Sequence, residues 1–177
     1  MGLFKALFAS GVYKAKNLYK EEMGSFFSLS FKDLDGSLVN FDKFDKNVVL
    51  VINVGSKCGL ADPSYKQMNR LYSKYQSKNF TILAFPSGQF SNQEYSDSKE
   101  IKAFVESKNA KFPVFEKSDV NGDKANPVYK WLKKAFPGEI TWNFHTKFIV
   151  DRSGKPVRRF EKKTSWEEIE RDIVKYL

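Results

Sequence analysis

Cysteine and histidine are nearly absent from this sequence: each occurs once in 177 residues. A single cysteine excludes a disulfide within the chain and any zinc or iron–sulfur site built on several thiolates. A single histidine excludes a metal site or a proton relay built on two histidines, so we expect no bound metal. No apolar run approaches the roughly 20 residues of a membrane-spanning helix. Redox or nucleophilic chemistry at sulfur therefore has one candidate residue.

Acidic residues are fewer than basic ones, 21 against 30, which leaves a net charge of +9. Such a charge favours anionic partners such as nucleic acid, lipid head groups or a small acidic thiol, and it equally serves solubility. The lysines are scattered, with no block of five like charges. No zinc-finger, RNA-recognition or recognition-helix pattern occurs, so we expect no nucleic-acid partner.

Residues 1–23 differ in composition from the rest of the chain. They contain no acidic residue before Glu21, and four lysines punctuate their apolar residues. Phe4, Leu7 and Phe8 fall on one helical face. A basic amphipathic segment of this kind is typical of a targeting peptide, a membrane-surface anchor or a helix docked on the domain, and the sequence leaves the three open. We expect one folded domain over residues 24–177.

Strand and helix patterns alternate from residue 25 onward. The runs 48–54 and 80–85 are almost continuously apolar, as expected of strands buried on both faces. Apolar residues at helical spacing predict a helix over 63–75, with Asp62 as its N-cap, and further helices around 101–105, 128–136 and 166–177. The other predicted strands are 112–115 and the hairpins 26–31 with 38–41 and 147–150 with 156–160. The pattern predicts an α/β fold, a mixed sheet with helices on both faces.

Cys58 lies between the predicted buried strand 48–54 and the helix that follows. Ligand and reaction sites in open α/β sheets lie at the carboxyl ends of strands. The positive end of the following helix and the neighbouring Lys57 both favour the thiolate, the reactive form of cysteine. A lone cysteine is also commonly a small buried hydrophobic residue, and position alone leaves both readings open.

Four motifs, in order along the chain, resemble those of the glutathione peroxidase family. The first surrounds Cys58 and differs from the family pattern Asn-Val-Ala-Ser-x-(Sec or Cys)-Gly by Gly55 in place of alanine. Of the other three, one follows the predicted strand 80–85, one precedes the predicted helix 128–136, and one enters the predicted strand 147–150. They read Asn53-Val-Gly-Ser-Lys-Cys-Gly59, Leu83-Ala-Phe-Pro-Ser-Gly-Gln-Phe90 with Gln93-Glu94, Phe112-Pro-Val-Phe-Glu-Lys-Ser-Asp-Val-Asn-Gly122, and Ile140-Thr-Trp-Asn-Phe144 with Phe148-Ile-Val150.

The resemblance implies a thioredoxin fold with an added N-terminal β-hairpin and a peroxidase active site. Cys58 would be the nucleophile that attacks a hydroperoxide. Gln93, Trp142 and Asn143 would surround its sulfur as hydrogen-bond donors, and Lys57 is a candidate for binding the carboxylates of a thiol. Gln89 lies in a motif but is interpreted as structural. No metal, haem or flavin is implied, and the co-substrate is glutathione or another thiol.

Departures from the family pattern bear on mechanism and assembly. A resolving cysteine that many members carry corresponds to Val105 here, and the cysteine of the second motif is Ser87. His145 is an extra residue that can disturb the placement of Trp142. The segment 136–141 is short where tetrameric members carry a long loop. The resemblance is therefore to the monomeric, phospholipid-hydroperoxide branch.

We interpret the sequence as a peroxidase of hydrogen peroxide and organic or lipid hydroperoxides, reduced by an external thiol, with glutathione expected. Three alternatives stay open: a thioredoxin-dependent peroxidase, a redox relay in which Cys58 passes oxidation to a partner protein, and an inactive membrane-docking module. We expect a cytoplasmic monomer. Peripheral membrane contact and organellar targeting through residues 1–23 are the alternatives for its location.

Overall fold

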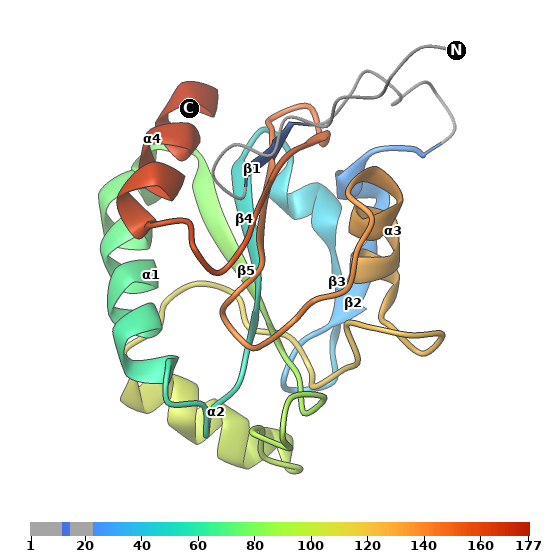
Figure 1. Ribbon diagram of the computed structural model, residues 1–177, viewed down its shortest axis with the longest axis vertical. Coiled ribbons are helices and arrows are strands. Elements are labelled where there is room, and N and C mark those ends of the chain that lie inside the picture. Colours follow the sequence, from blue (N-terminus) through green and yellow to red (C-terminus); the bar gives the residue numbers. More distant parts are fainter. Residues whose placement is uncertain (1–11, 15–22) are drawn as a thin grey trace.

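The computed structural model describes residues 12–14 and 23–177, and its centre is a five-stranded sheet (Figure 1). The order across the sheet is β1-β7-β6-β4-β5. β4 and the edge strand β5 run parallel, and β4 also pairs with β6 in the antiparallel sense. The strands are β1 (Val12–Lys14), β4 (Val48–Val54), β5 (Phe80–Pro86), β6 (Lys147–Val150) and β7 (Pro156–Phe160).

The two parallel strands are buried along their whole length, which agrees with their apolar sequences. Alternate residues of β4 contribute to opposite sides of the sheet: Leu50 and Ile52 belong to one hydrophobic cluster, and Val51 to the other. This is the period-two alternation of a strand covered on both faces. The prediction of a mixed sheet with two covered faces is confirmed.

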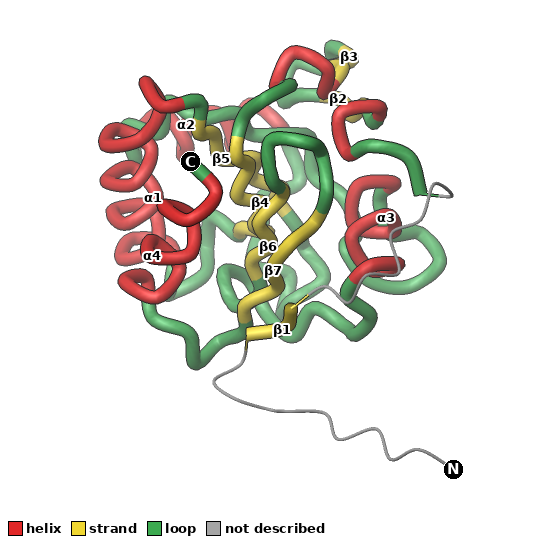
Figure 2. Tube along the Cα trace, turned by 90° about the horizontal axis from the view of Figure 1, so that it is seen from above, coloured by secondary structure: helices red, strands yellow, loops and turns green. Residues whose placement is uncertain are grey.

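The helices divide between the two faces of the sheet, as Figure 2 shows. One face is covered by α1 (Ala61–Tyr75), α2 (Ser98–Ser107) and α4 (Trp166–Tyr176), whose apolar residues share one cluster with β4 and β5. The other face is covered by α3 (Pro127–Ala135). None of the helices within residues 23–177 has the length and apolar character needed to cross a membrane.

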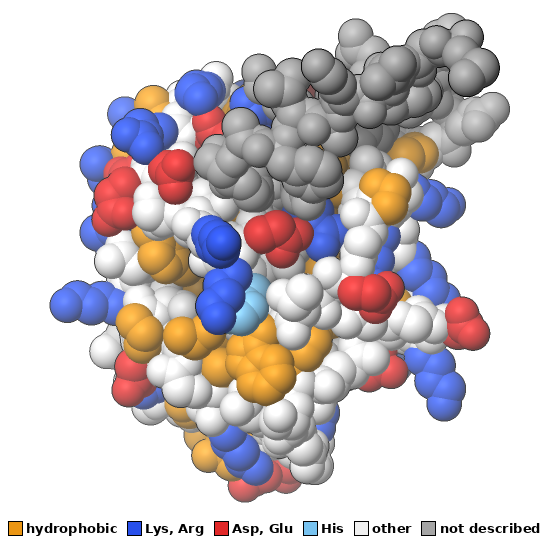
Figure 3. Space-filling view, viewed as in Figure 1, with side chains coloured by type: hydrophobic (Ala, Val, Ile, Leu, Met, Phe, Trp, Pro, Cys, Tyr) orange, Lys and Arg blue, Asp and Glu red, His pale blue; other side chains and the backbone are white. Residues whose placement is uncertain are grey.

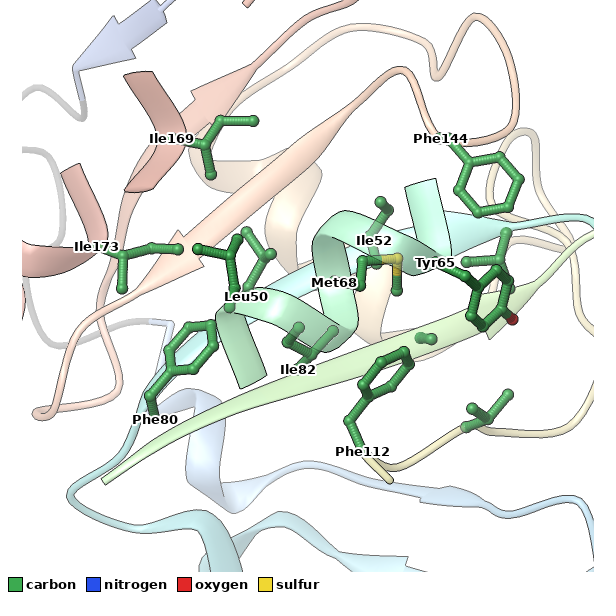
Figure 4. Close-up of a cluster of buried hydrophobic side chains, with 14 of the residues drawn as sticks. Leu50, Ile52, Tyr65, Met68, Phe80, Ile82, Phe112, Phe144, Ile169 and Ile173 are labelled. Carbon is green, nitrogen blue, oxygen red and sulfur yellow. The ribbon is translucent and has the colours of Figure 1, made fainter. Parts of the chain in front are cut away.

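The hydrophobic cluster that α1, α2 and α4 share with β4 and β5 extends to the candidate site. Figure 4 shows Met68 and Tyr65 of α1 reaching over the sheet toward Ile52, with Phe144 at one end and Ile169 and Ile173 of α4 at the other. Cys58 belongs to this cluster. The nucleophile candidate is therefore attached to the buried core, where close packing leaves side chains little freedom to move.

The added N-terminal hairpin is present but shorter than its apolar pattern predicts. Its strands are β2 (Ser30–Lys32) and β3 (Leu38–Asn40), joined by a turn in which Asp33 accepts from the N–H groups of Asp35 and Ser37. Residues Phe26–Ser28 form a 3₁₀ turn instead of strand, because Phe26 and Phe27 pack into the second cluster with α3. Two further 3₁₀ turns are Phe41–Phe44 and Gln76–Lys78. With the sheet order above, this is the thioredoxin fold with its added hairpin.

Two local predictions are wrong. Asp62 is not the N-cap of α1, because the helix begins at Ala61 and Leu60 precedes it without a side-chain cap. The stretch 112–115 forms isolated bridges, Val114 with Ala84 and Phe115 with Asp33, instead of a strand. Each bridge satisfies backbone groups of this stretch. A longer ladder of hydrogen bonds does not form, because Pro113 has no N–H group to donate.

The basic segment 1–23 is described only in part. Val12–Lys14 forms the edge strand β1, which pairs with β7 in the antiparallel sense and places Lys14 opposite Arg158. The sequence pattern did not predict this strand. Met23 accepts a hydrogen bond from the Trp131 indole at 2.9 Å. The predicted helical face of Phe4, Leu7 and Phe8 lies outside the described residues.

Candidate active site around Cys58

Cys58 lies in the turn between β4 and α1. Its N–H donates to Gly55 O at 3.1 Å, and its own carbonyl accepts from Ala61 N at 2.9 Å, at the start of the helix. The residue is 5% exposed. Because the first N–H groups of a helix carry partial positive charge, negative charge on the adjacent sulfur is favoured there. The position expected from the sequence, at the carboxyl end of a buried strand, is confirmed.

Residues that follow β5 hold this turn in place. Lys57 N donates to Gln93 O at 2.9 Å, and Ser56 N donates to the Glu94 carboxylate at 3.1 Å. Glu94 also accepts from its neighbour Tyr95 N and is 1% exposed. Burial raises the pKa of Glu94, and the hydrogen bonds from Ser56 and Tyr95 oppose that rise. The nucleophile turn is therefore tied to Gln93 and Glu94 by two hydrogen bonds that its backbone N–H groups donate.

Gln93 is half-buried beside this connection. Its backbone oxygen is occupied by Lys57 N, while its side-chain oxygen is buried without a hydrogen-bond partner. The oxygen of the Gln93 side-chain amide therefore accepts no hydrogen bond that would fix the side chain in place. Glu94 belongs to the same motif, and its structural role of accepting from Ser56 N was not predicted from the sequence. The one indication of that role in the sequence is the position of this carboxylate next to a predicted site residue.

A network of amide groups places the segment that carries Trp142. Gln89 accepts from Val120 N and Asn121 N at 2.7 and 2.9 Å, as its structural interpretation requires. Asn121 in turn accepts from Ile140 N and donates to Ile140 O. Trp142 is half-buried and its ring lies 5.9 Å from that of Phe90. The motif after β5 and the segment 140–144, far apart in sequence, are thereby brought together.

Asn143 is completely buried and partly satisfied. Its side-chain oxygen accepts from Asn53 Nδ2 at 3.1 Å, and Phe144 N donates to Asn53 O at 2.9 Å. The Asn143 Nδ2 group has no hydrogen-bond partner. A buried donor without a partner costs free energy, which favours a use for it in the reaction. Asn53 was not singled out by the sequence reading, although a polar residue inside a buried apolar strand marks it.

The structure brings the four predicted catalytic residues into one neighbourhood. Gln93 and Asn143 flank the turn of Cys58, and Trp142 precedes Asn143 directly. Among residues 23–177, no side chain donates a hydrogen bond to Cys58 Sγ. The role of the three donors toward sulfur therefore stays a prediction. The described residues leave one amide donor, Asn143 Nδ2, and one amide acceptor, Gln93 Oε1, buried without partners.

Lys57, the candidate for binding a thiol's carboxylates, is exposed next to Cys58. Its ammonium lies 4.4 Å above the centre of the Tyr95 ring. An exposed cation–π contact contributes about 0.5–1 kcal/mol, so this contact restrains the ammonium only weakly. Because no carboxylate within residues 23–177 forms an ion pair with it, Lys57 can attract an anionic co-substrate.

The extra residue His145 lies at the surface beside the site. Figure 3 shows this single histidine next to basic side chains and a group of hydrophobic side chains. Burial lowers the pKa of His145, and nearby Lys162 and Lys147 lower it further. His145 N donates to Trp142 O at 3.4 Å, and Phe144 between them has φ of +66°. The additional residue is accommodated in a tight turn that leaves Asn143 facing Asn53.

The positions of the two absent cysteines are both occupied by buried side chains. Val105 lies on the inner face of α2, and Ser87 follows β5, with Ser87 N donating to Val54 O. Neither position offers a thiol that could attack an oxidised Cys58. Cys58 is the one cysteine of the chain and is not in a disulfide.

Comparisons with known proteins agree on one family. A family model described as glutathione peroxidase matches residues 26–133. Probable glutathione peroxidase 3, mitochondrial, from Arabidopsis thaliana is 47% identical over 158 residues, 86% of this chain and 76% of that protein. A probable phospholipid hydroperoxide glutathione peroxidase from Mesembryanthemum crystallinum is 45% identical over 151 residues, 82% and 88% of the two chains. The crystal structure of T. cruzi GPX1 is similar with a TM-score of 0.72 and 35% identity, covering 86% of this chain and 96% of that one.

Proposed function

Because this chain belongs to the glutathione peroxidase family and is a peroxidase, we propose that Cys58 alone reduces hydrogen peroxide and organic or lipid hydroperoxides, with an external thiol as reductant. One observation carries the proposal. The chain's single cysteine lies just before α1, in a turn flanked by the side-chain amides of Gln93 and Asn143, and the Asn143 Nδ2 donor is buried without a partner.

The proposed oxidation step transfers one oxygen. The Cys58 thiolate attacks the nearer peroxide oxygen, a sulfur–oxygen bond forms, and the oxygen–oxygen bond breaks. The product at Cys58 is a sulfenic acid. The leaving alkoxide takes the proton that the thiol released and departs as an alcohol, or as water when the substrate is hydrogen peroxide. Sulfur supplies both electrons, so this step needs no metal, haem or flavin.

We assign Gln93, Trp142 and Asn143 as donors to the charge that moves from sulfur to the leaving oxygen. Side-chain amides and an indole N–H donate hydrogen bonds without adding a base that would compete for the proton. Preorganised donors of this kind are worth about 10²–10³ in rate for each one removed. Burial of Asn143 and half-burial of Gln93 and Trp142 support the assignment, because a donor in a dry site interacts more strongly than one in water.

The reductant is proposed to be glutathione. A first glutathione attacks the sulfenic acid, releasing water and leaving a mixed disulfide with Cys58, and a second one releases the Cys58 thiol and glutathione disulfide. The absence of a thiol at Val105 and Ser87 supports an external thiol at both steps. Lys57, exposed beside the site, is proposed to attract the carboxylates of this thiol.

The proposed substrate range includes bulky lipid hydroperoxides. Two features support this proposal: the segment 136–141 that precedes Trp142 is short, and a phospholipid hydroperoxide glutathione peroxidase is among the relatives. We propose a monomer that contacts membranes peripherally through its basic segment 1–23. A cytoplasmic location is the first proposal, and the mitochondrial and chloroplastic names of relatives support import directed by that segment as the alternative.

A comparison of reductants tests the function. Steady-state turnover of hydrogen peroxide and of a phospholipid hydroperoxide is measured with millimolar glutathione and, separately, with a complete thioredoxin system. Turnover should rise with glutathione concentration, and thioredoxin should be the weaker donor. Faster turnover with thioredoxin would contradict the glutathione mechanism. Negligible turnover with both, together with a trapped disulfide to a partner protein, would favour the redox relay.

A further inference from the structure

Asn53 is a polar residue inside an otherwise apolar strand, near the end of β4, and it is completely buried. The hydrogen-bonded ladder between β4 and β6 ends at Ile52, which lies opposite Lys147. Asn53 is therefore the first residue of β4 beyond that ladder. From this point on, the connection between β4 and the chain that precedes β6 depends on the hydrogen bonds that Asn53 itself makes.

Asn53 forms a hydrogen bond with each of three consecutive residues. Its side-chain Nδ2 donates to Trp142 O at 3.3 Å and to Asn143 Oδ1 at 3.1 Å. Its backbone oxygen accepts from Phe144 N at 2.9 Å. One residue of β4 thus holds the segment that carries two of the predicted donors, and β4 leads directly into the turn of Cys58.

The same contacts determine which end of the Asn143 amide faces that turn. A side-chain amide has one donor end and one acceptor end, whereas a backbone carbonyl can only accept. The Asn53 atom that faces Trp142 O is therefore its NH₂ group, and the Asn143 atom that faces this NH₂ group is its oxygen. The NH₂ group of Asn143 then points away from Asn53. It is the Asn143 group nearest the Cβ position of Gly55, in the turn of Cys58.

The two asparagines keep polar atoms that do not contribute to stability. Among residues 23–177, neither Asn143 Nδ2 nor Asn53 Oδ1 has a hydrogen-bond partner, although both atoms are buried. A buried polar atom without a partner costs free energy, and two apolar side chains of the same shape would avoid that cost at both positions. The pair is therefore poorly suited to stability alone, which supports a use for it in the reaction.

We propose that Asn53 is a positioning residue of the peroxidase reaction: by donating to Trp142 O and to the side-chain oxygen of Asn143, it turns the free N–H group of Asn143 toward the turn of Cys58. The inference rests on the proposed function, since it assumes that Asn143 is a donor in the oxidation step. Because Asn53 acts by orienting Asn143, its effect on the rate should depend on the presence of the Asn143 amide.

A double-mutant cycle tests this dependence. The second-order rate constant for oxidation of Cys58 by hydrogen peroxide is measured by mass spectrometry after dimedone labelling in the wild type, Asn53→Leu, Asn143→Leu and the double variant. Asn143→Leu should be slower by about 10²- to 10³-fold, as for removal of a preorganised donor. Asn53→Leu should be slower by roughly 10- to 100-fold, because the amide remains but is no longer held in place. The double variant should be no slower than Asn143→Leu.

Stability should change in a different order from the rate, and this difference separates orientation from a purely structural role. Each single variant removes a partner from the other asparagine and should lower Tm by roughly 2–10 °C. The double variant removes both side-chain amides, so its Tm should be at least as high as that of Asn53→Leu. The expected result is recovery of Tm without recovery of the rate. All rate constants are measured well below the lowest Tm of the set.

Asn69→Leu is the matched control, because it makes the same chemical change at a distance from the site. Asn69 Nδ2 donates to the backbone oxygen of Lys108 at 2.7 Å and so ties α1 to the end of α2. This variant should lower Tm, while its rate constant should stay within about twofold of the wild type. An Asn53→Leu rate equal to the wild type, or losses that multiply in the double variant, would overturn the inference. If Asn53→Leu does not fold, Asn53→Ser replaces it in both backgrounds, with the same expected order of rates.

The same cycle separates the inference from the proposed function. A wild-type Cys58 that reacts with peroxide no faster than a free cysteine would overturn the proposed peroxidase mechanism itself. A fast wild type with an unaffected Asn143→Leu variant would remove Asn143 from the donors and overturn the role of Asn53 with it. A fast wild type that is slowed by Asn143→Leu but not by Asn53→Leu would overturn the positioning role alone.

Discussion

Replacing Lys147 by methionine should stabilise the protein near neutral pH. Lys147 is the first residue of β6 and is 5% exposed. Its ammonium lies 4.8 Å above the Trp166 ring centre and donates to His145 O at 3.3 Å, with Glu161 as the nearby carboxylate that favours its charge. Burial outweighs these contacts and lowers the pKa of Lys147 from 10.5 to about 8. Methionine fills a similar volume without a charge to bury.

The size and sign of the effect follow from that pKa. An amine with a folded pKa of about 8 and an unfolded pKa of 10.5 is protonated more fully in the unfolded chain between these values. The unfolding free energy of the wild type should therefore rise with pH across this window. At 1.36 kcal/mol for each pH unit, the penalty of the charged lysine below pH 8 is about 3 kcal/mol. Lys147→Met lacks this titration, and its advantage should be largest at pH 7.

Urea unfolding at pH 7, 8, 9 and 10 measures this difference. The unfolding free energy of Lys147→Met minus that of the wild type should shrink by roughly 2–3 kcal/mol between pH 7 and pH 10. Lys163→Met is the matched control, because it makes the same chemical change at an exposed side chain. A difference that does not change with pH, or one that grows as pH rises, would refute the reasoning from burial.

Three further predictions concern the site. Cys58→Ser should abolish turnover and keep the fold, because a hydroxyl is a poor nucleophile at neutral pH; residual turnover above background in a peroxide assay would contradict the assignment. Trp142→Phe should slow oxidation of Cys58 by about 10- to 1000-fold, and an unchanged rate constant would mean that its indole N–H plays no part. Glu94→Gln should keep the acceptor for Ser56 N and nearly full activity, whereas Glu94→Ala should cost about 1–3 kcal/mol in urea unfolding; equal effects of the two variants would argue against the hydrogen-bonded connection.

Much of the fold could be predicted because its signals are local. The sequences of β4 and β5 are apolar at nearly every position. A strand needs apolar residues on both of its faces when both faces of the sheet are covered. α3 begins where Asn126 caps it and Pro127 opens it, as residue preferences at helix starts predict. Where local signals compete with packing, packing decided: Phe26 and Phe27 form a 3₁₀ turn because the cluster around α3 takes up their rings.

The candidate site divides in the same way. Cys58 was predictable, since the sequence holds one thiol and places it after a buried strand, and the motifs pointed to Gln93, Trp142 and Asn143. The pairing of Glu94 with Ser56 N and of Asn53 with Asn143 was not, because residues 38 and 90 positions apart meet only when the strands are assembled. The sequence by itself determined the reactive atom and the residue types around it. Only the tertiary structure decided that Gly55 and Asn143 touch and that Lys147 is buried, because close packing and loss of water are properties of the folded interior and leave no local signal in the chain.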